Sequence, residues 1–488
     1  MNAKKKALTW ICLVLMLGLL AGCAGNGDNK NNEPSKPPAG QQEENGQSGK
    51  GSDTADGLPK TEKPVSLKLY TTSAVDKTEF DEIIGEWKKV EPNIDVEMVV
   101  LSGQDSQEKI RVAIAGGEKI DLAMMERTTF SDKADKLYYK LNDLMEQEGL
   151  DYLKEYGDYG KATMVGDDIY GIAKVLSPGA VYVNKEMFEK NGVPIPDDNT
   201  WTYEDYFKMI KDLTVKDSGG RTQVRGGMHW QGSFLAVTDL ASIGGWDIVN
   251  EDGTPNLDSP ILRKSIHYYY DAMYVDGSMP TDADVQANKV VGLFDFVGEK
   301  FATLIGASNS ILFLDVWKEA GHLDPAVDDR DPFLLLKMPR WDENSPPNQI
   351  TTIVTSYSVT RTTEHPVEAY KFLRWYTTKG LELSAKVAHR VPAWQGADEE
   401  LLMDSWRYYK NNDGEVVQGK DRKELYQRAL DKSANVVFPK YRGQYPYSSM
   451  LLEELKKELS LILADEKSIE QGLQDAQAAG LKIYEREK

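Results

Sequence analysis

Near the start of the folded part, apolar residues change from a strand spacing to a helix spacing and back again. Residues 65–69 alternate apolar and polar side chains, which predicts a strand. Apolar residues then recur at helical spacing over 80–87, behind Thr78 as the expected N-cap. The sequence Glu-Pro-Asn at 91–93 is expected to end this helix, because proline cannot continue it.

The same alternation continues further along the chain. Residues 94–101 and 120–125 are apolar enough for two more strands, and the helical segment 110–115 between them runs to a pair of glycines. Strand, helix, strand, helix, strand in about sixty residues predicts a parallel sheet with helices on its faces. A similar alternation resumes after Ile169, interrupted by a polar region rich in Gly and Asp between 215 and 258.

Two helices are expected at the end of the chain. Leu451, Leu455, Leu459 and Ile462 form one helical stripe. A capping-box pattern at 468–471 predicts the start of the second helix. The sequence contains no internal repeat and no coiled-coil pattern.

The first 23 residues have the pattern of an export signal. Lysines at 4–6 precede an apolar run that is too short to span a bilayer comfortably, and the run ends in Leu20-Ala21-Gly22-Cys23. This ending resembles the lipobox of bacterial lipoproteins, which implies cleavage after residue 22 and a lipid on Cys23. An uncleaved anchor helix is the alternative, although the glycines at 22, 25 and 27 would weaken it. Both interpretations place the rest of the chain outside the cytoplasm.

The segment that follows the signal has the composition of a disordered chain. Residues 23–64 contain almost no large apolar side chain, so we expect a disordered tether with an end-to-end distance of roughly 35 Å.

The composition of the whole chain limits the kinds of site that it can form. Cys12 lies in the signal, so a mature chain beginning at Cys23 has no second cysteine for an internal disulfide, a catalytic thiol or a thiolate metal site. The 488 residues are 40% hydrophobic, which is enough for two domains. A formal charge of −20 argues against nucleic acid and anionic membranes as partners.

Four segments, taken in order, resemble the extracellular solute-binding proteins of family 1, the maltose-binding-like receptors of ABC importers. Their order and spacing carry the resemblance, which covers roughly residues 65 to 485. The segments are 113–122; 168–172 with 182–188 and 200–204; 244–246 with 251–253 and 257–260; and 357–359 with 365–373.

The resemblance implies an α/β, two-lobed periplasmic-binding-protein type II fold, the Venus flytrap, with a ligand cleft between the lobes. Lobe 1 is expected to comprise residues 65–175 and about 340–390, and lobe 2 residues 176–339 and about 391–448, followed by C-terminal helices at 449–488. The chain is expected to cross between the lobes near 174–178, 338–339 and 391–392. Hinges at such crossings allow ligand binding to drive closure.

The resemblance also implies a function. We expect a monomeric, non-catalytic receptor that needs no cofactor or metal and is held by its lipid on the extracytoplasmic face of the bacterial cell membrane. It would capture a carbohydrate, most simply an oligosaccharide, and deliver it to ABC permease subunits. The acidic composition leaves open a second hypothesis, that the same fold binds a polyamine or another cation.

Sugars stack on flat aromatic rings and bond to polar side chains, so tryptophans in loops are the first candidates for ligand contact. Trp230 lies in a polar segment, with a core position as the alternative, and Trp394 follows the third crossing. Trp87 and Trp375 lie on apolar helical stripes and are expected in the core, whereas Trp201 is expected to pack before a helix.

Loops that follow strands supply the polar candidates, because open α/β sheets bind ligands there. Glu126 could accept two sugar hydroxyls, with a solvated loop charge as the alternative. Ser308 and Asn309 stand where the family often has an aromatic residue. The ligand-binding residues expected from these arguments are Thr72, Glu126, Ser177, Trp230, Ser308, Asn309, Arg390 and Trp394.

The sequence offers little support for an enzyme. It contains no His-Glu-x-x-His, no Gly-x-Ser-x-Gly and no Walker phosphate loop. A surface glycoside hydrolase stays as a weaker alternative, because 78 acidic residues always supply some carboxylate pair. Four aspartates at 324–331 lack the spacing of an EF-hand, so we expect a solvated acidic loop there.

Overall fold

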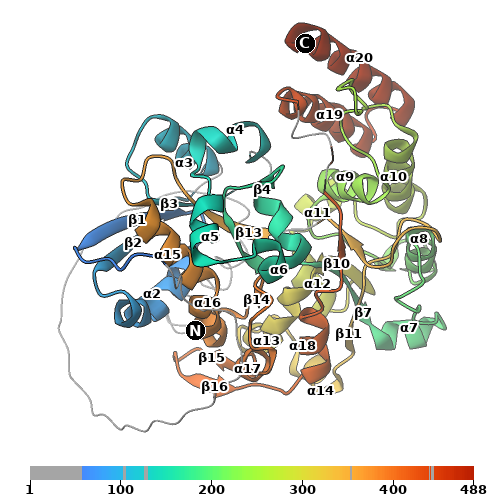
Figure 1. Cartoon of the computed structure of the whole chain (residues 1–488). Helices are drawn as coiled ribbons and strands as arrows, with labels where there is room; N and C mark the ends of the chain where they lie inside the picture. Colours follow the sequence, from blue (N-terminus) through green and yellow to red (C-terminus); the bar gives the residue numbers. More distant parts are fainter. Residues whose placement is uncertain (1–57, 103–105, 126–129, 352–353, 439, 441–444) are drawn as a thin grey trace.

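The computed structural model describes residues 58–102, 106–125, 130–351, 354–438, 440 and 445–488. Two α/β lobes lie side by side, each built around its own sheet (Figure 1). Residues 1–57, which include the expected signal, Cys23 and most of the expected tether, lie outside the described part. Within that part, no helix is both long and apolar enough to cross a membrane.

The first lobe contains a six-stranded mixed sheet. In spatial order its strands are β14 (Val391–Pro392), β6 (Ile172–Leu176), β13 (Val354–Val359), β3 (Leu122–Met125), β1 (Val65–Thr71) and β2 (Ile94–Val100). β1 pairs in parallel with β2 and β3, as predicted, whereas β13 and β14 run antiparallel to β6. These two strands belong to later segments of the chain, which enter the sheet in the opposite direction after the second lobe.

Helices flank this sheet, and in two of them a tryptophan that the sequence predicts in the core is buried. Trp87 and Trp375 are buried with ring centroids 5.3 Å apart, as expected for core residues. The N-cap prediction was wrong: the first helix begins earlier, because the Ser73 side chain accepts from the Asp76 N–H, and it ends at Glu91 as predicted. The helices of this lobe are α2 (Ala74–Val90), α3 (Ser106–Ala115), α4 (Phe130–Leu137), α5 (Asn142–Glu148), α6 (Tyr152–Tyr156), α15 (Pro366–Thr377) and α16 (Lys379–Ala388), with the 3-10 helix η2 (Gly157–Thr163).

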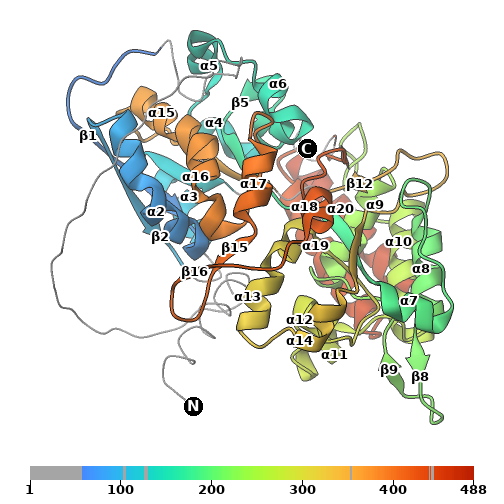
Figure 2. The same cartoon turned by 90° about the horizontal axis from the view of Figure 1, so that it is seen from below.

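The second lobe has a smaller antiparallel sheet with β7 (Gly179–Asn184) between β10 (Thr303–Ala307) and β11 (Phe333–Leu336). A hairpin of β8 (Val215–Lys216) and β9 (Thr222–Val224) projects from this lobe (Figure 2). The helical segments of the lobe are α7 (Lys185–Asn191), α8 (Tyr203–Asp212), α9 (Ser233–Ile243), α10 (Pro260–Tyr270), η3 (Asp271–Val275), α11 (Asp282–Ala287), α12 (Gly292–Val297), η4 (Ser308–Phe313), α13 (Leu314–Glu319) and α14 (Pro325–Arg330).

Two expectations for this lobe were wrong. The polar region at 215–258 contains the helix α9, whose apolar residues pack into the core. The acidic run at 324–331 is not a solvated loop, since α14 buries Asp328 and the Lys318 ammonium lies 2.6 Å from its carboxylate. Arg422, almost a hundred residues away, also binds Asp328, so local sequence gave no sign of this pairing.

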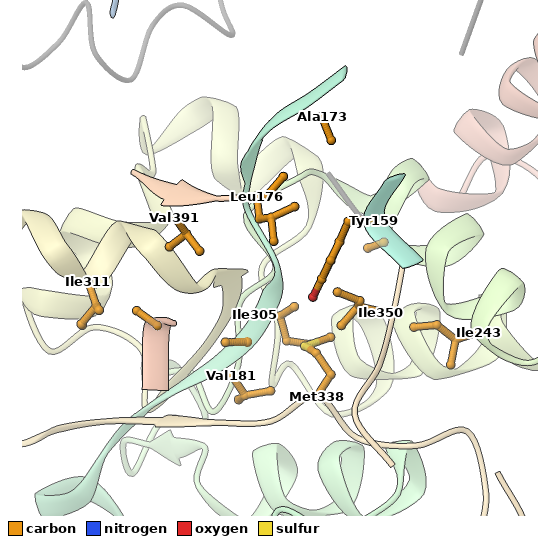
Figure 3. Packing of buried hydrophobic residues seen from close by; sticks show 14 of the residues in the cluster. Tyr159, Ala173, Leu176, Val181, Ile243, Ile305, Ile311, Met338, Ile350 and Val391 are labelled. Carbon is orange, nitrogen blue, oxygen red and sulfur yellow. The ribbon is translucent and has the colours of Figure 1, made fainter. Parts of the chain in front are cut away.

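The chain passes between the sheets at short connections. Ser177 and Pro178 join β6 in the first sheet to β7 in the second. The side chains around this connection form one continuous apolar cluster, in which Tyr159 of the first lobe points toward Met338 and Ile350 (Figure 3). The lobes therefore share part of their hydrophobic core.

The last quarter of the chain packs against both lobes. The predicted C-terminal helices are confirmed as α19 (Ser448–Leu463) and α20 (Ile469–Glu487), which begins at Ser468. They lie on the second lobe, where the Gln477 side chain accepts from the Leu257 N–H. The remaining elements are β4 (Met164–Val165), β5 (Asp168–Ile169), β12 (Gln349–Ile350), α17 (Glu399–Ser405), β15 (Tyr408–Lys410), β16 (Val416–Gln418), α18 (Lys423–Ala429) and β17 (Asn435–Val436).

Candidate ligand-binding site

A hollow of ≈ 450 Å³, open to solvent, lies in the second lobe beside the first crossing. Segments far apart in sequence meet here, and the lining residues belong to the second lobe and to the connections between the sheets. The residues that line it are Ser177, Gly179, Tyr203, His229, Trp230, Gln231, Ala236, Asp239, Leu240, Ile243, Tyr269, Ile305, Gly306, Ala307, Met338, Ile350 and Thr351.

One face of α9 forms a wall of the hollow. Ala236, Asp239, Leu240 and Ile243 line it at helical spacing, so successive turns present the same face. The three apolar members are buried, whereas Asp239 is partly exposed. Asp239 was not among the residues expected from the sequence, because this helix was not predicted.

An extended segment beside β10 supplies the aromatic and amide groups. The Trp230 N–H donates to the Ile305 carbonyl at 3.1 Å, which fixes the backbone next to the strand. The Trp230 side chain is partly buried, lines the hollow and also packs against the hydrophobic core, so its contact with a ligand stays a prediction. Gln231 adds an amide to the same rim.

His229 enters the hollow as a neutral group. Its Nδ1 accepts from the Gln231 N–H at 3.3 Å, so the remaining proton lies on Nε2. Burial lowers the pKa of His229 to about 3, because the protonated ring loses its solvation. At neutral pH the imidazole therefore offers a donor without a charge.

Two phenols lie deeper in the hollow. Tyr203 and Tyr269 are both 2% exposed. Burial is the main reason that the pKa of each phenol is raised, and the negative charge of Asp239 raises both further. Asp239 is therefore close enough to interact with both rings, while the phenols themselves stay neutral.

The structure brings together two of the ligand-binding residues expected from the sequence, Ser177 and Trp230, which both line the hollow. Ser308 instead lines a second, smaller hollow of ≈ 340 Å³ and donates to the Ala429 carbonyl at 3.3 Å. Asn309 follows it and is buried. Trp394 is 2% exposed, and its Nε1 donates to the Glu155 carboxylate at 2.6 Å.

Two further expected residues lie in the first lobe, and one lies outside the described residues. Thr72 is partly exposed after β1, and its hydroxyl contacts the Met124 sulfur at 3.3 Å. Arg390 precedes β14 and is 19% exposed. Glu126 lies in the segment 126–129, which the structure does not describe.

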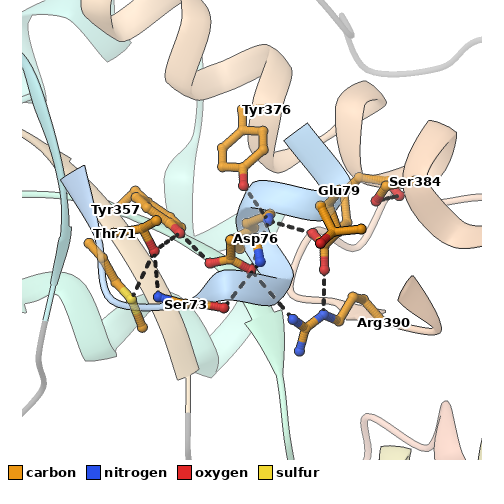
Figure 4. A network of polar contacts seen from close by, with 12 residues as sticks. Thr71, Ser73, Asp76, Glu79, Tyr357, Tyr376, Ser384 and Arg390 are labelled. Atoms are coloured by element: carbon orange, nitrogen blue, oxygen red, sulfur yellow. Dashed lines mark hydrogen bonds and ion pairs between the residues drawn. The ribbon is translucent and has the colours of Figure 1, made fainter. Parts of the chain in front are cut away.

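Arg390 belongs to a buried network of charges at the start of α2 (Figure 4). Its Nε donates to Glu79 at 2.6 Å, and Lys174 Nζ donates to the other oxygen of Glu79 at 2.8 Å. Asp76 contacts both cations and accepts from the Tyr357 hydroxyl. Burial alone would raise the pKa of Glu79, but Lys174 and Arg390 outweigh it and lower that pKa. Two acids and two bases thus compensate one another.

The described residues contain no group of three or more side chains suited to hold a metal ion. The geometry consists of aromatic rings, neutral hydrogen-bonding groups and one carboxylate around a solvent-open hollow. This set can hold a small polar molecule by stacking and hydrogen bonds.

Solved structures share the fold. A sugar transporter from Rhizobium etli, solved in an open conformation, superposes with a TM-score of 0.67 at 18% identity, covering 86% of this chain and 99% of that one. An ABC substrate-binding protein from Listeria monocytogenes, in complex with cycloalternan, gives 0.64 at 18% identity over 86% and 98%. At such identities the likeness concerns the fold, and it supports the two-lobed, type II architecture expected from the sequence.

Sequence comparisons give the family. An arabinooligosaccharide-binding protein from Halalkalibacterium halodurans is 22% identical over 251 residues, which is 50% of this chain and 52% of that protein. The match therefore spans only about half the length of this relative. The family model of the bacterial extracellular solute-binding proteins matches residues 71–382. The chain belongs to the family of bacterial extracellular solute-binding proteins.

Proposed function

We propose that this protein is a lipid-anchored receptor that captures an oligosaccharide outside the cell and presents it to an ABC permease. The lipid would be carried by Cys23, and residues 23–64 would form the tether. The ligand would leave the receptor chemically unaltered. The lobe limits given by the sequence, near 175, 340 and 390, belong to the same proposal.

The hollow beside the first crossing is the observation that carries the proposal. Its rim offers the ring of Trp230, and stacking on a sugar face suits such a ring. Ser177, Gln231, neutral His229 and the Asp239 carboxylate can form hydrogen bonds with hydroxyl groups. This combination suits a polar, uncharged molecule with apolar faces.

The named ligands of relatives agree with this chemistry. The Halalkalibacterium relative is named for arabinooligosaccharides, and the Listeria protein was solved with cycloalternan. Both ligands consist of several sugar units, which favours an oligosaccharide over a monosaccharide here. The first lobe would then supply a second set of contacts from Thr72 and Arg390 when the lobes close.

Calorimetric titration with a panel of plant and bacterial oligosaccharides tests the function. We expect at least one sugar to bind and to be recovered intact by chromatography. Binding of spermidine with no sugar response would favour the polyamine hypothesis, and cleavage products would favour a hydrolase. A panel in which no sugar binds contradicts the proposal.

A tryptophan pair tests the site. Trp230→Ala should weaken sugar binding by about 1 to 2 kcal/mol, through the loss of one stacked ring. Trp341→Ala is the matched control, because Trp341 is also partly exposed but does not line the hollow. Equal affinity of the Trp230→Ala variant and the wild type would remove this site while leaving the family intact.

A further inference from the structure

One buried hydroxyl near the hollow has no hydrogen-bond partner within the described part of the chain. It belongs to Tyr159, which lies in η2 of the first lobe and is 2% exposed. A buried hydroxyl without a partner costs free energy, because folding removes its bonds to water and returns none. Such groups are rare in folded proteins, so this one calls for a reason.

Two neighbouring tyrosines show that the first lobe can satisfy a buried phenol. The Tyr152 hydroxyl accepts from the Ala173 N–H at 3.2 Å. The Tyr156 hydroxyl accepts from the Arg374 guanidinium at 2.8 Å. Both phenols therefore stabilise the first lobe through hydrogen bonds, whereas the Tyr159 hydroxyl does not.

The Tyr159 side chain is directed across the junction of the lobes toward the hollow. Its hydroxyl points toward Ile305, Met338 and Ile350 (Figure 3). All three of these residues line the hollow, while Tyr159 itself does not. The hydroxyl therefore lies behind one wall of the hollow.

Met338 is the most adaptable side chain of this wall. Its backbone N–H donates to the Asn348 side chain at 3.2 Å, which fixes the main chain at this point. Its unbranched thioether side chain has three rotatable bonds and adapts more easily than the β-branched side chains of Ile305 and Ile350. A change of the Met338 rotamer would open the wall toward Tyr159 without moving the backbone.

The Tyr159 phenol is a neutral donor at physiological pH. Burial raises its pKa above the ordinary value for tyrosine, and the negative charges of Asp431 and Asp158 raise it further. Of these two carboxylates, Asp431 accepts from the Ser433 N–H at 2.8 Å. The protonated phenol can donate to an oxygen atom of a ligand.

We propose that Tyr159 is a ligand-binding residue of the first lobe, and that its hydroxyl donates to a sugar hydroxyl once the Met338 side chain moves aside. The inference rests on the proposed function, because the bound carbohydrate supplies the acceptor. It extends the site from the second lobe across the junction into the first. The ligand would remove the cost of the buried, unpaired phenol, so this bond favours the bound state.

Tyr159→Phe tests the inference, because it removes only the hydroxyl. Calorimetry with the neutral trisaccharides of glucose, mannose and arabinose measures affinity, and urea denaturation measures the midpoint of unfolding. A trisaccharide that binds the wild type should bind the variant about fivefold more weakly, as expected for the loss of one hydrogen bond. The urea midpoint of the variant should stay the same or rise, since the free protein loses no hydrogen bond.

Tyr152→Phe is the matched control, because it removes a phenol hydroxyl from the same region of the first lobe. Here the Ala173 N–H loses its acceptor, so the urea midpoint should fall. Affinity for the same trisaccharide should stay within about twofold of the wild type. The two variants are therefore expected to separate binding from stability in opposite directions.

Monodeoxy forms of the bound trisaccharide distinguish a direct bond from an effect on the lobes. A direct bond predicts one monodeoxy form that the wild type and Tyr159→Phe bind equally, because that form lacks the accepting hydroxyl. If Tyr159→Phe instead weakens every monodeoxy form as much as the parent, the inference is overturned. The hydroxyl would then act through a contact between the lobes, for which Asp431 is the nearby acceptor.

The remaining outcomes separate this inference from the proposed function. Equal affinity of the wild type and Tyr159→Phe for the parent trisaccharide overturns the inference and leaves the proposed function standing. A lower urea midpoint for Tyr159→Phe also contradicts it, because the hydroxyl would then have a partner in the free protein. If none of the three trisaccharides binds the wild type, the proposed function fails and the inference fails with it.

Discussion

Lys174→Met removes one cation from the buried charge network of the first lobe and nearly preserves the length of the side chain. Lys174 is fully buried, and its Nζ lies 2.8 Å from Glu79, 2.8 Å from the Tyr376 hydroxyl and 3.6 Å from Asp76. The substitution leaves two buried carboxylates facing Arg390 alone. Such an uncompensated buried charge is costly because neither water nor a counter-ion solvates it.

The size of the expected loss in the free energy of unfolding depends on the ion pairs that remain after the substitution. Breaking a buried ion pair by removing one partner costs about 3–5 kcal/mol. Arg390 Nε still binds Glu79 at 2.6 Å, so the loss belongs near the lower end, about 3 kcal/mol. Adding Glu79→Gln restores a one-to-one balance between Arg390 and Asp76, so the double variant should recover more than half of that loss.

Urea denaturation followed by circular dichroism measures the free energy of unfolding. Lys77→Met is the control, because Lys77 lies in α2 beside Asp76 and Glu79, but its ion pair with Asp81 is exposed and should contribute less than about 1 kcal/mol. Acidification gives a second readout. The pKa of Glu79 is lowered in the folded state, so its contribution is complete above the unfolded value of 4.5 and is lost as the pH falls through the folded value. On acidification, the Lys174→Met variant should lose less free energy of unfolding than the wild type. A loss below about 1 kcal/mol for Lys174→Met, equal to that of Lys77→Met, would refute the reasoning.

Two further predictions concern the second lobe. Because the pKa of His229 is about 3, sugar affinity measured by calorimetry should be the same at about pH 5 and pH 8, and a change near the ordinary histidine pKa would contradict a neutral ring. Gly226→Ala should destabilise the protein by about 3 kcal/mol, since a Cβ there would lie 1.7 Å from the Ile210 carbonyl oxygen. Gly85→Ala, in α2 with open space around it, should instead stabilise by about 1 kcal/mol, and thermal melts that rank the two alanine variants alike would contradict this account.

Features that depend on neighbouring residues could be predicted from the sequence. The end of α2 at Glu91, the burial of Trp87 and of Trp375, and the start of α20 at Ser468 all follow from local spacing and capping. The N-cap of α2 was placed too late, because Thr78 and Ser73 are equally plausible caps and the apolar stripe does not distinguish them.

Features that depend on distant residues could not be predicted. Arg390 and Glu79 are 311 residues apart, so no local pattern announces their ion pair. Trp394 stands in a segment that suggested a cleft position, yet Glu155 binds its indole in the first lobe. Asp239 was missed for a different reason: α9 has only 11 residues, with apolar side chains on most of its surface and glycines at both ends, so its inward stripe is hard to recognise.

Some side chains that line the hollow also take part in the contact between the lobes. A ligand bound in the hollow could therefore change how the lobes pack against each other. Met338 and Ile350 line the hollow and also belong to the apolar cluster toward which Tyr159 of the first lobe points (Figure 3). Apolar cores are close-packed, so a ligand that displaces either side chain changes the surface on which Tyr159 packs. A ligand shifts an equilibrium between conformations only through contacts that differ between them. We expect Met338 and Ile350 to be such contacts, because a rotation of one lobe against the other would change how Tyr159 packs beside them.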